Sequence, residues 1–323
     1  MYKKTVISID VGGTKISGGI VTEDGKIRYF IKESTNRDGG YKVVKQIVQM
    51  IEYLISMIEG TKSIVGVGIS VPGIVINNVV IMTPNIRGWE NIALAKLLES
   101  ELKRKIPIVI IDDRIAVALG EHWLGAAKNK KNAVIIIIGT GVGAGIIIDG
   151  YPYFGSTGVA GAIGWWITNR KEELIKETKK GFLEEKISGP GIAKKAIIEL
   201  KKQKKKTKTL LVDMCENRLE RITSEMVFNA AKKGDSFAKE IIEDAATNLG
   251  VAISNIVSIL NPEVVVITGG VGKEFANFST VINSIVRKFS QPYAVKNVKI
   301  AYSKLGYNAY LLGVAKYVLE KYA

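Results

Sequence analysis

The chain has 323 residues, about twice the size of an average domain, so two domains with separate hydrophobic cores are expected. Apolar residues make up 47% of the sequence, but no stretch reaches the run of about 20 uncharged apolar residues that a membrane-spanning helix needs. The formal net charge is +15. Much of this excess lies between Lys201 and Lys208, where no aromatic residue is interleaved for base stacking, so a solvated loop or helix end is favoured over a nucleic-acid site.

The cysteine and histidine content limits the metal chemistry. The single cysteine, Cys215, excludes an internal disulfide and a cysteine-based zinc site, and the single histidine, His122, excludes a multi-histidine centre. A bound metal is therefore expected to be a hard cation such as Mg²⁺. His122 lies in a helix-surface pattern, which favours a structural role. Abundant Lys, Glu, Ile and Val with few Cys, Met and His resembles proteins of hot environments.

The first half of the sequence alternates β-branched runs with amphipathic helical patterns. Strands are expected at 5–9, 16–21, 27–31, 64–70 and 106–111, and helices at 40–58, 92–102 and 115–124. The first four residues lead directly into a strand, so no signal peptide is expected and the protein is expected to be cytoplasmic. This order of elements indicates an α/β fold.

The second half begins the same order again. A strand at 134–138, a glycine-rich turn and a strand at 146–148 lead to a hairpin at Asp149 and Gly150, just as the first two strands lead to Asp24 and Gly25. Helices are then expected at 191–202, 224–232 and 236–259, a strand at 264–267, and a closing helix at 309–322. We interpret the sequence as an internal duplication of one α/β unit.

Each copy carries a glycine-rich turn between its first two strands, Gly12 to Lys15 (GGTK) in the first and Gly139 to Gly145 (GTGVGAG) in the second. Residues without a Cβ let N–H groups approach an anion, and consecutive N–H groups form a nest for phosphate oxygens. The hydroxyls of Thr14 and Thr140 add one donor to each loop. Neither loop has the Walker A or the Rossmann pattern. One such loop alone is equally consistent with a plain hairpin turn, but the recurrence favours phosphate binding.

The pair Asp112 and Asp113 follows the strand at 106–111, at the carboxyl edge where open α/β sheets bind their ligands. A carboxylate there suits the removal of a proton from a hydroxyl nucleophile, so the two phosphate loops and this pair together indicate phosphoryl transfer. The alternative is helix capping, since Asp is a favoured N-cap and a helical pattern starts at Ile115.

Five spaced motifs occur in an order that resembles the ROK family of sugar kinases and sugar-sensing repressors. They are Asp10 to Lys15 (DVGGTK), Ser70 to Gly73 (SVPG), Thr83 to Trp89 (TPNIRGW), Asp113 with the ALGE that ends at Glu121, and Gly139 to Gly143 (GTGVG). Further matches at Phe228 to Asp235 and at Leu260 to Gly270 extend the resemblance over nearly the whole chain.

The resemblance implies an α/β, actin-like or hexokinase-type fold of two ribonuclease H-like duplicated domains with a central cleft. Residues 1–114 with 305–323 would form a small N-terminal domain, and 115–304 a large one. Asp113 would be the catalytic base, and Asp10 would order Mg²⁺ through water. Phosphate and nucleotide contacts are implied for Asp10, Gly12, Gly13, Thr14, Lys15, Gly139, Thr140, Gly141, Gly143, Gly269 and Gly270.

The sugar side departs from the family pattern. The family's Glu-x-Gly-His becomes Ala162 to Trp165 (AIGW), the Asn before the catalytic Asp becomes Asp112, and the zinc-binding cysteine cluster is missing, so no zinc site is expected. Since that Glu and His contact the hydroxyls around C1 and C2, altered specificity is expected. Trp165 offers a flat face to a sugar, unless it and Trp166 pack in a core or interface. Sugar contacts are implied for Gly73, Thr83, Asn85, Asp112, Asp113, Trp165 and Glu184.

The leading hypothesis is an ATP- and Mg²⁺-dependent phosphotransferase with an alcohol group as acceptor. It would phosphorylate the primary (6-) hydroxyl of a hexose or hexose derivative, as a glucokinase- or hexokinase-like enzyme of altered or broad specificity. The alternatives are a catalytically weak sugar- or nucleotide-binding regulator and a phosphatase or acyl kinase of the same superfold. The expected partner is a small-molecule sugar, with no nucleic acid or membrane, in a homodimer or a dimer of dimers.

Overall fold

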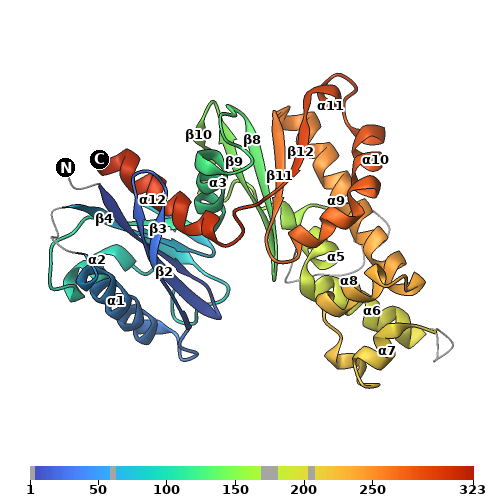
Figure 1. Cartoon of the computed structure of the whole chain (residues 1–323), viewed down its shortest axis with the longest axis horizontal. Coiled ribbons are helices and arrows are strands. Elements are labelled where there is room, and N and C mark those ends of the chain that lie inside the picture. Colours follow the sequence, from blue (N-terminus) through green and yellow to red (C-terminus); the bar gives the residue numbers. More distant parts are fainter. Residues whose placement is uncertain (1–3, 59–62, 169–180, 203–207) are drawn as a thin grey trace. The chain divides into compact units, whose positions relative to one another are not determined.

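The computed structural model describes residues 4–58, 63–168, 181–202 and 208–323 (Figure 1). The chain divides into two compact units. The first unit comprises Met1–Lys131, Gly145–Ala160 and Lys304–Ala323, and the second comprises Asn132–Ala144 and Gly161–Ser303. None of the helices described is long and apolar enough to cross a membrane.

The first sheet has the strand order β3-β2-β1-β4-β7. Its strands are β1 (Thr5–Val11), β2 (Lys15–Thr22), β3 (Ile27–Ser34), β4 (Ile64–Val71) and β7 (Ile108–Asp112). The β1-β2 and β2-β3 pairs are antiparallel, whereas β4 and β7 join in parallel. Every residue of β1 and β7 is buried, as expected for strands of a sheet that is covered on both faces.

Four helices accompany this sheet, and they are α1 (Gly40–Ser56), α2 (Leu94–Glu101), α3 (Asp113–Leu124) and α12 (Asn308–Tyr322). Four residues of the apolar stripe expected for the helix at 40–58, Val43, Ile47, Ile51 and Leu54, are fully buried in α1, whereas Ile58 lies beyond the end of the helix and is partly buried. A short hairpin of β5 (Ile74–Ile76) and β6 (Val79–Met82) follows β4 and was not predicted.

The helices α3 and α12 cross at glycines that let their backbones touch. A Cβ placed on Gly313 would lie 1.6 Å from the Ala116 oxygen, and one on Gly120 would lie 2.1 Å from the Ala309 oxygen. On the other side α12 packs against β4, where a Cβ on Gly68 would lie 2.3 Å from Val314. These contacts place α12 against both α3 and β4.

The second sheet has the order β10-β9-β8-β11-β12. Its strands are β8 (Ala133–Ile138), β9 (Val142–Ile148), β10 (Tyr151–Pro152), β11 (Val264–Thr268) and β12 (Lys299–Tyr302). The strands β8, β11 and β12 are parallel to one another. The boundary between the two units passes through β9, after Ala144.

Helices make up most of the rest of the second unit. The α-helices are α5 (Phe182–Ile187), α6 (Gly189–Lys202), α7 (Leu210–Met214), α8 (Ser224–Lys232), α9 (Ser236–Leu260), α10 (Ser279–Phe289) and α11 (Ala294–Asn297). Short 3₁₀ helices occupy Ile163–Trp165, Leu219–Arg221 and Gly272–Phe278. The core gathers around α9, and Phe228 packs edge-to-face on Phe275 with ring centroids 5.4 Å apart.

The two sheets share one strand order when the second copy is counted from β8, and this confirms the predicted duplication of an α/β unit. The domain boundary differs from the one expected at residue 114, because that position lies inside α3. The whole of α3 belongs to the first unit, since it packs along α12. Residues 145–160 also fall in the first unit rather than in the expected large domain.

Candidate functional site

The carboxyl ends of three parallel strands bring polar side chains to one edge of the first sheet. Asp10 on β1 pairs in register with Ser70 on β4, and the next residue of β4, Val71, pairs with Asp112 at the end of β7. The Ser70 hydroxyl donates a hydrogen bond of 2.7 Å to Asp10 Oδ1. Parallel pairing alone therefore accounts for the proximity of Asp10 to the aspartate pair.

Asp10 is an unusually placed carboxyl group, with only 4% of the residue exposed. Burial raises its pKa from 3.8 to about 6, and hydrogen bonds from Ser70 and Tyr307 oppose that rise. A single carboxylate beside a site for phosphates is a common arrangement for Mg²⁺, which keeps several waters and takes its other ligands from phosphate oxygens. Asp10 therefore fits a magnesium role, although the described residues hold no group of three or more His, Cys, Asp or Glu that would cage a metal.

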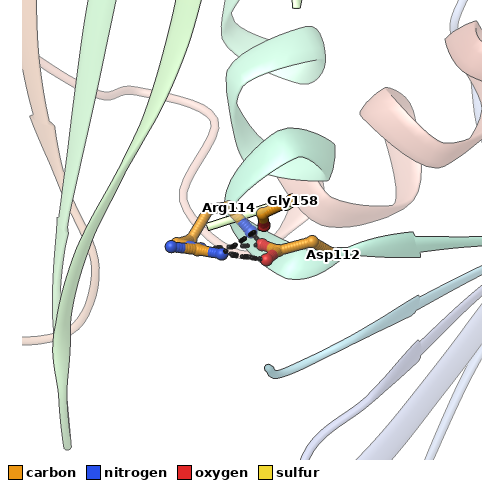
Figure 2. Close-up of polar contacts among 3 residues, drawn as sticks. All are labelled: Asp112, Arg114 and Gly158. Carbon is orange, nitrogen blue, oxygen red and sulfur yellow. Dashed lines mark hydrogen bonds and ion pairs between the residues drawn. The ribbon is translucent and has the colours of Figure 1, made fainter. Parts of the chain in front are cut away.

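Asp112 and Asp113 lie on either side of the junction between β7 and α3, since Asp112 ends the strand and Asp113 begins the helix. Asp112 is the N-cap of α3, and its Oδ1 accepts from the Arg114 N–H at 2.7 Å, so the capping interpretation is correct for Asp112. The Arg114 guanidinium also binds both oxygens of Asp112 (Figure 2). A sugar hydroxyl that approached Asp112 would compete with Arg114.

Asp113 occupies the first turn of α3 and is partly exposed. Its pKa lies well above the usual range for Asp, because burial and the neighbouring negative charges of Asp112 and Asp10 disfavour the ionised form. The positive charge of Arg114 acts in the opposite direction. A carboxyl group with a raised pKa is a stronger base once ionised, and this is the property that a proton acceptor near neutral pH needs.

The first glycine-rich loop is the predicted turn of the β1-β2 hairpin. The Gly12 N–H closes the turn on the Lys15 oxygen at 2.8 Å, and no described group accepts from the N–H of Gly13 or Thr14. A Cβ on Gly13 would lie 2.5 Å from the Asn85 Cβ, so this glycine permits close packing of the segment around Asn85. Lys15 lies in β2 and is exposed.

The second glycine-rich loop occupies the same place between the first two strands of its sheet, but it closes over two residues rather than three. The Gly139 N–H bonds to the Gly141 oxygen at 2.9 Å, and in the described chain the N–H groups of Thr140 and Gly141 have no acceptor. A Cβ on Gly139 would meet no atom within 4 Å. The next N–H, that of Val142, donates to Glu184 Oε2 at 3.0 Å. Each loop thus presents two consecutive uncommitted N–H groups, whereas Gly143 lies inside β9 rather than in the loop.

A cavity of about 350 Å³ opens beside the second loop, within the second unit. It is lined by Gly139, Thr140, Gly189, Pro190, Ala193, Ile222, Thr223, Ser224 and Val271. The turn after β11 packs against the end of β8, since a Cβ on Gly269 would lie 2.3 Å from the Ile138 oxygen. Gly269 also has a φ of +93°, which favours glycine at this position. Gly270 itself is exposed, and a Cβ on it would meet nothing within 4 Å.

The residues expected to contact a sugar fall into two groups. Gly73, Thr83 and Asn85 belong to the first unit, where a Cβ on Gly73 would lie 3.0 Å from the Thr83 Cα. Thr83 is buried, and its Oγ1 has no hydrogen-bond partner among the described residues. An unpaired buried hydroxyl is costly unless a ligand or water completes it.

Trp165 and Glu184 belong to the second unit. Trp165 is 61% exposed, whereas Trp166 packs against the core, so core packing holds for the second tryptophan only. The last cysteine of the family's zinc cluster would fall at Phe182, the first residue of α5, and residues 169–180 before it lie outside the described residues. The His122 Nε2–H donates a hydrogen bond of 2.8 Å to the Lys130 carbonyl oxygen, which is consistent with the expected structural role.

Three residues beside the aspartates were not predicted to have a role. Arg114 was missed although the spacing Asp-x-Arg was visible in the sequence. Tyr307 and Tyr310 lie at the start of α12, with their ring centroids 5.2 Å apart. Burial raises the pKa of both hydroxyls, and the negative charges of Asp10 and Asp113 raise it further. No local pattern connects these tyrosines with Asp10, because they come from the opposite end of the chain.

Two α/β units of equal strand order, with a carboxylate cluster in one and a cavity beside the glycine loop of the other, define an actin-like, hexokinase-type protein. The model of the ROK family matches residues 6–321, and the chain belongs to this family. It is 32% identical to a glucokinase of Halalkalibacterium halodurans over 319 residues, covering 97% of this chain and 94% of the relative.

Two further comparisons show the range of the family. A xylose repressor of Caldicellulosiruptor bescii is 29% identical over 283 residues, covering 86% of this chain and 69% of the repressor. A crystal structure of a ROK family glucokinase from Streptomyces griseus, in complex with glucose and AMPPNP, is 25% identical with a TM-score of 0.77. That match covers 98% of this chain and 99% of the crystallised one. Both kinases and repressors are therefore among the relatives.

Proposed function

We propose that the protein is an ATP-dependent kinase that phosphorylates the primary (6-) hydroxyl of a hexose or hexose derivative, with altered or broad specificity. The observation that carries the proposal is Asp113, a partly exposed carboxyl group with a raised pKa at the end of a parallel strand. The end-to-end similarity to a glucokinase supports a sugar as the acceptor, and the solved relative with AMPPNP supports ATP as the donor.

The proposed chemistry begins with the acceptor hydroxyl. As the oxygen attacks the terminal phosphorus of ATP, its proton passes to the ionised Asp113 carboxylate, and the bond from phosphorus to the bridging oxygen of ADP breaks. A positioned base of this kind contributes on the order of 10²- to 10⁴-fold to the rate. The raised pKa of Asp113 brings its basicity closer to the operating pH, and this supports the assignment.

The donor side is proposed to use both glycine loops. The uncommitted N–H pairs at Gly13–Thr14 and Thr140–Gly141 suit phosphate oxygens, and Asp10 suits the water shell of Mg²⁺, which when bound neutralises charge on the transferring group. The roles implied for Gly12, Lys15 and Gly143 are retained as proposals, with Gly12 closing its turn and Gly143 lying in β9 behind its loop.

The cavity beside Thr140 is proposed to hold the adenosine. Apolar atoms of Pro190, Ala193, Ile222 and Val271 line it together with the hydroxyls of Thr223 and Ser224. A mainly apolar cavity with a few polar groups is the usual setting for a flat heteroaromatic ring. The turn of Gly269 and Gly270, which lies directly before Val271, supports the expected border of this site.

The acceptor side is proposed to use Gly73, Thr83, Asn85, Trp165 and Glu184, and the role implied for Asp112 is retained only as the partner that holds Arg114. The unpaired Thr83 hydroxyl is the strongest support, because a sugar hydroxyl would satisfy it. The exposed ring of Trp165 suits the apolar face of a pyranose. Glu184 already binds the Val142 N–H, which leaves its other oxygen for a sugar hydroxyl. Ala162 and Trp165 lack the carboxylate and imidazole expected around C1 and C2, so weaker discrimination there is proposed.

The second candidate function is a catalytically weak sugar- or nucleotide-binding regulator, and the similarity to a xylose repressor favours it. Titration calorimetry with hexoses, pentoses and ATP separates the two functions. Sugar binding without turnover would support the regulator. A homodimer or dimer of dimers in the cytoplasm completes the proposal, and sedimentation analysis would test the assembly.

The kinase proposal is tested by ADP release, coupled to NADH oxidation, over a panel of hexoses and hexose derivatives. The Asp113→Asn variant should lose at least 100-fold in rate on every accepted sugar, in line with the loss of a general base. The matched control is Asp244→Asn, which removes an exposed carboxylate from α9 in the second unit and should leave the rate unchanged. Equal rates for wild type and Asp113→Asn would exclude Asp113 as the base.

A further inference from the structure

Three carboxyl groups gather at one edge of the first sheet, on Asp10, Asp112 and Asp113. Among these three aspartates, and within the part of the chain that the structure describes, only Asp112 forms an ion pair, and its partner is Arg114. The Arg114 Nε lies 2.9 Å from Asp112 Oδ1 and 3.0 Å from Oδ2, and Nη2 contacts Oδ2 as well (Figure 2). The two side chains therefore meet in a fork, two residues apart along the chain.

The fork engages both oxygens of Asp112, and the Asp113 side chain is hydrogen-bonded to Asp112 as well. A carboxylate has about four lone-pair sites, and Asp112 receives four contacts from Arg114, three from the guanidinium and one from the backbone N–H at 2.7 Å. Its side chain is only 4% exposed, and that of Arg114 is 14% exposed. A paired charge at this depth is hydrogen-bonded and satisfied, whereas an unpaired one would be strongly destabilising.

Arg114 also fastens a distant segment of the same unit. Its Nη2 donates to the Gly158 oxygen at 3.3 Å, and Figure 2 shows Gly158 beside the fork. A second contact joins the two regions, because a Cβ on Gly145 would lie 2.3 Å from the Arg114 oxygen. The segment from Gly145 to Ala160, the end of β7 and the start of α3 thus meet at one side chain.

We propose that Arg114 is a positioning residue that holds Asp113 in its reactive orientation, by closing the fork with Asp112 around it and by fastening the fork to Gly158. The proposal rests on the proposed function, in which Asp113 takes the proton of the acceptor hydroxyl. Asp113 is the residue between the two partners of the fork. A side-chain bond from one neighbour to the other restricts the backbone dihedrals of the residue between them, and so fixes the direction of its side chain.

The surroundings of Asp113 explain why a cation is needed at this place. The groups that face it are Asp10 from β1, Asp112 from β7, and Tyr307 and Tyr310 from α12, all of them anionic or neutral. Arg114 supplies the opposing positive charge from α3. A lysine would keep that charge, but its single ammonium cannot make the planar fork and reach the Gly158 oxygen together.

The test compares Arg114→Met, Arg114→Lys and the double variant Asp112→Asn/Arg114→Met. The double variant removes both charges, so it isolates the positioning role from the cost of a buried unpaired carboxylate. The matched control is Arg221→Met, which breaks an exposed ion pair with Glu216 in the second unit. Each variant is measured by kcat, KM for ATP, melting temperature, and hydrogen–deuterium exchange of peptides that cover 112–117 and 153–160.

The expected loss for Arg114→Met is on the order of 10²-fold in kcat, with KM for ATP unchanged, because a small misplacement of a reacting group has that effect. Arg114→Lys should recover part of the loss. The double variant should regain the melting temperature but keep the low kcat, and Arg221→Met should behave as wild type. A double variant with wild-type stability and wild-type kcat would overturn the positioning role.

Hydrogen exchange keeps this test separate from the proposed function. Arg114→Met and the double variant should both exchange faster than wild type in the two peptides, and unchanged exchange in both would overturn the fastening to Gly158. If the wild-type protein turned over no sugar of the panel, the proposed kinase function would fail, while the exchange data would still decide whether Arg114 holds these segments together. If Arg114→Met failed to fold, the double variant would decide.

Discussion

Gly139→Ala tests whether the second glycine loop serves the fold or a ligand. A Cβ at this position would meet no atom within 4 Å, and the backbone of Gly139 is not among those with positive φ. Alanine therefore fits the loop without strain. Gly139 and Thr140 also line the cavity where the phosphates of ATP are proposed to approach.

The two roles predict effects of opposite sign. A glycine-to-alanine change at a compatible site raises the free energy of unfolding by about 0.4–1 kcal/mol, because it restricts the unfolded chain. A methyl group that obstructs a phosphate costs binding energy instead. One misplaced methyl group typically changes affinity by about 1–3 kcal/mol, or roughly 10- to 200-fold, and KM for ATP should rise within that range.

The assay measures urea unfolding and the KM values for ATP and for the sugar in parallel. Gly139→Ala should unfold at an equal or higher urea concentration than wild type, raise KM for ATP, and leave KM for the sugar unchanged. A folded variant with the wild-type KM for ATP would refute the assignment of this loop to the phosphates. A variant that unfolds at a lower urea concentration would refute the conclusion that a Cβ at Gly139 meets no other atom.

Three further predictions address packing, the sugar side and pH. Gly313→Ala should lower the free energy of unfolding by about 1–3 kcal/mol or prevent folding, because its Cβ would lie 1.6 Å from the Ala116 oxygen; urea unfolding measures this, and an unchanged midpoint would contradict the helix crossing. Thr83→Val removes a hydroxyl without a described partner, so it should raise KM for the sugar without loss of melting temperature; an unchanged KM would exclude that contact. Because the pKa of Asp10 is raised to about 6, the folded state binds this proton more tightly than the unfolded state does. The contribution of Asp10 to the free energy of unfolding is therefore most favourable below about pH 4 and is lost as the pH rises to about 6. In metal-free buffer, Asp10→Asn should therefore be more stable than wild type at pH 7 by up to about 3 kcal/mol and equally stable at pH 4, and a variant less stable at pH 7 would contradict the assigned burial.

Local spacing was sufficient to predict most of the framework. The β-branched runs result from strands that are buried on both faces, and the helical stripe with Val43 and Ile47 results from a helix that is buried on one face. The carboxylate edge was also accessible, because parallel strands end together and both Asp10 and Asp112 stand at strand ends. The duplication was visible since both copies keep the same order of strand, turn and strand.

Contacts between distant segments were beyond such patterns. The spacing of Gly13 identified a turn, but only the structure shows that Asn85 occupies the space where its Cβ would be. Tyr307 contacts Asp10 because α12 packs against the first sheet, and no periodic pattern in the sequence predicts a contact between residues so far apart in the chain. The spacing of Asp112 and Arg114 is a local signal, but Asp112 was interpreted as a sugar contact or a helix cap, and Arg114 was given no role.

The central claim is that Asp113 removes the proton of a sugar hydroxyl during transfer from ATP. Its most direct test is a single-turnover measurement of γ-phosphoryl transfer to the best sugar of the panel, with ATP and sugar saturating. Asp113→Asn should slow this step by about 10²- to 10⁴-fold while binding ATP as tightly as wild type. Transfer at the wild-type rate in Asp113→Asn would contradict the account.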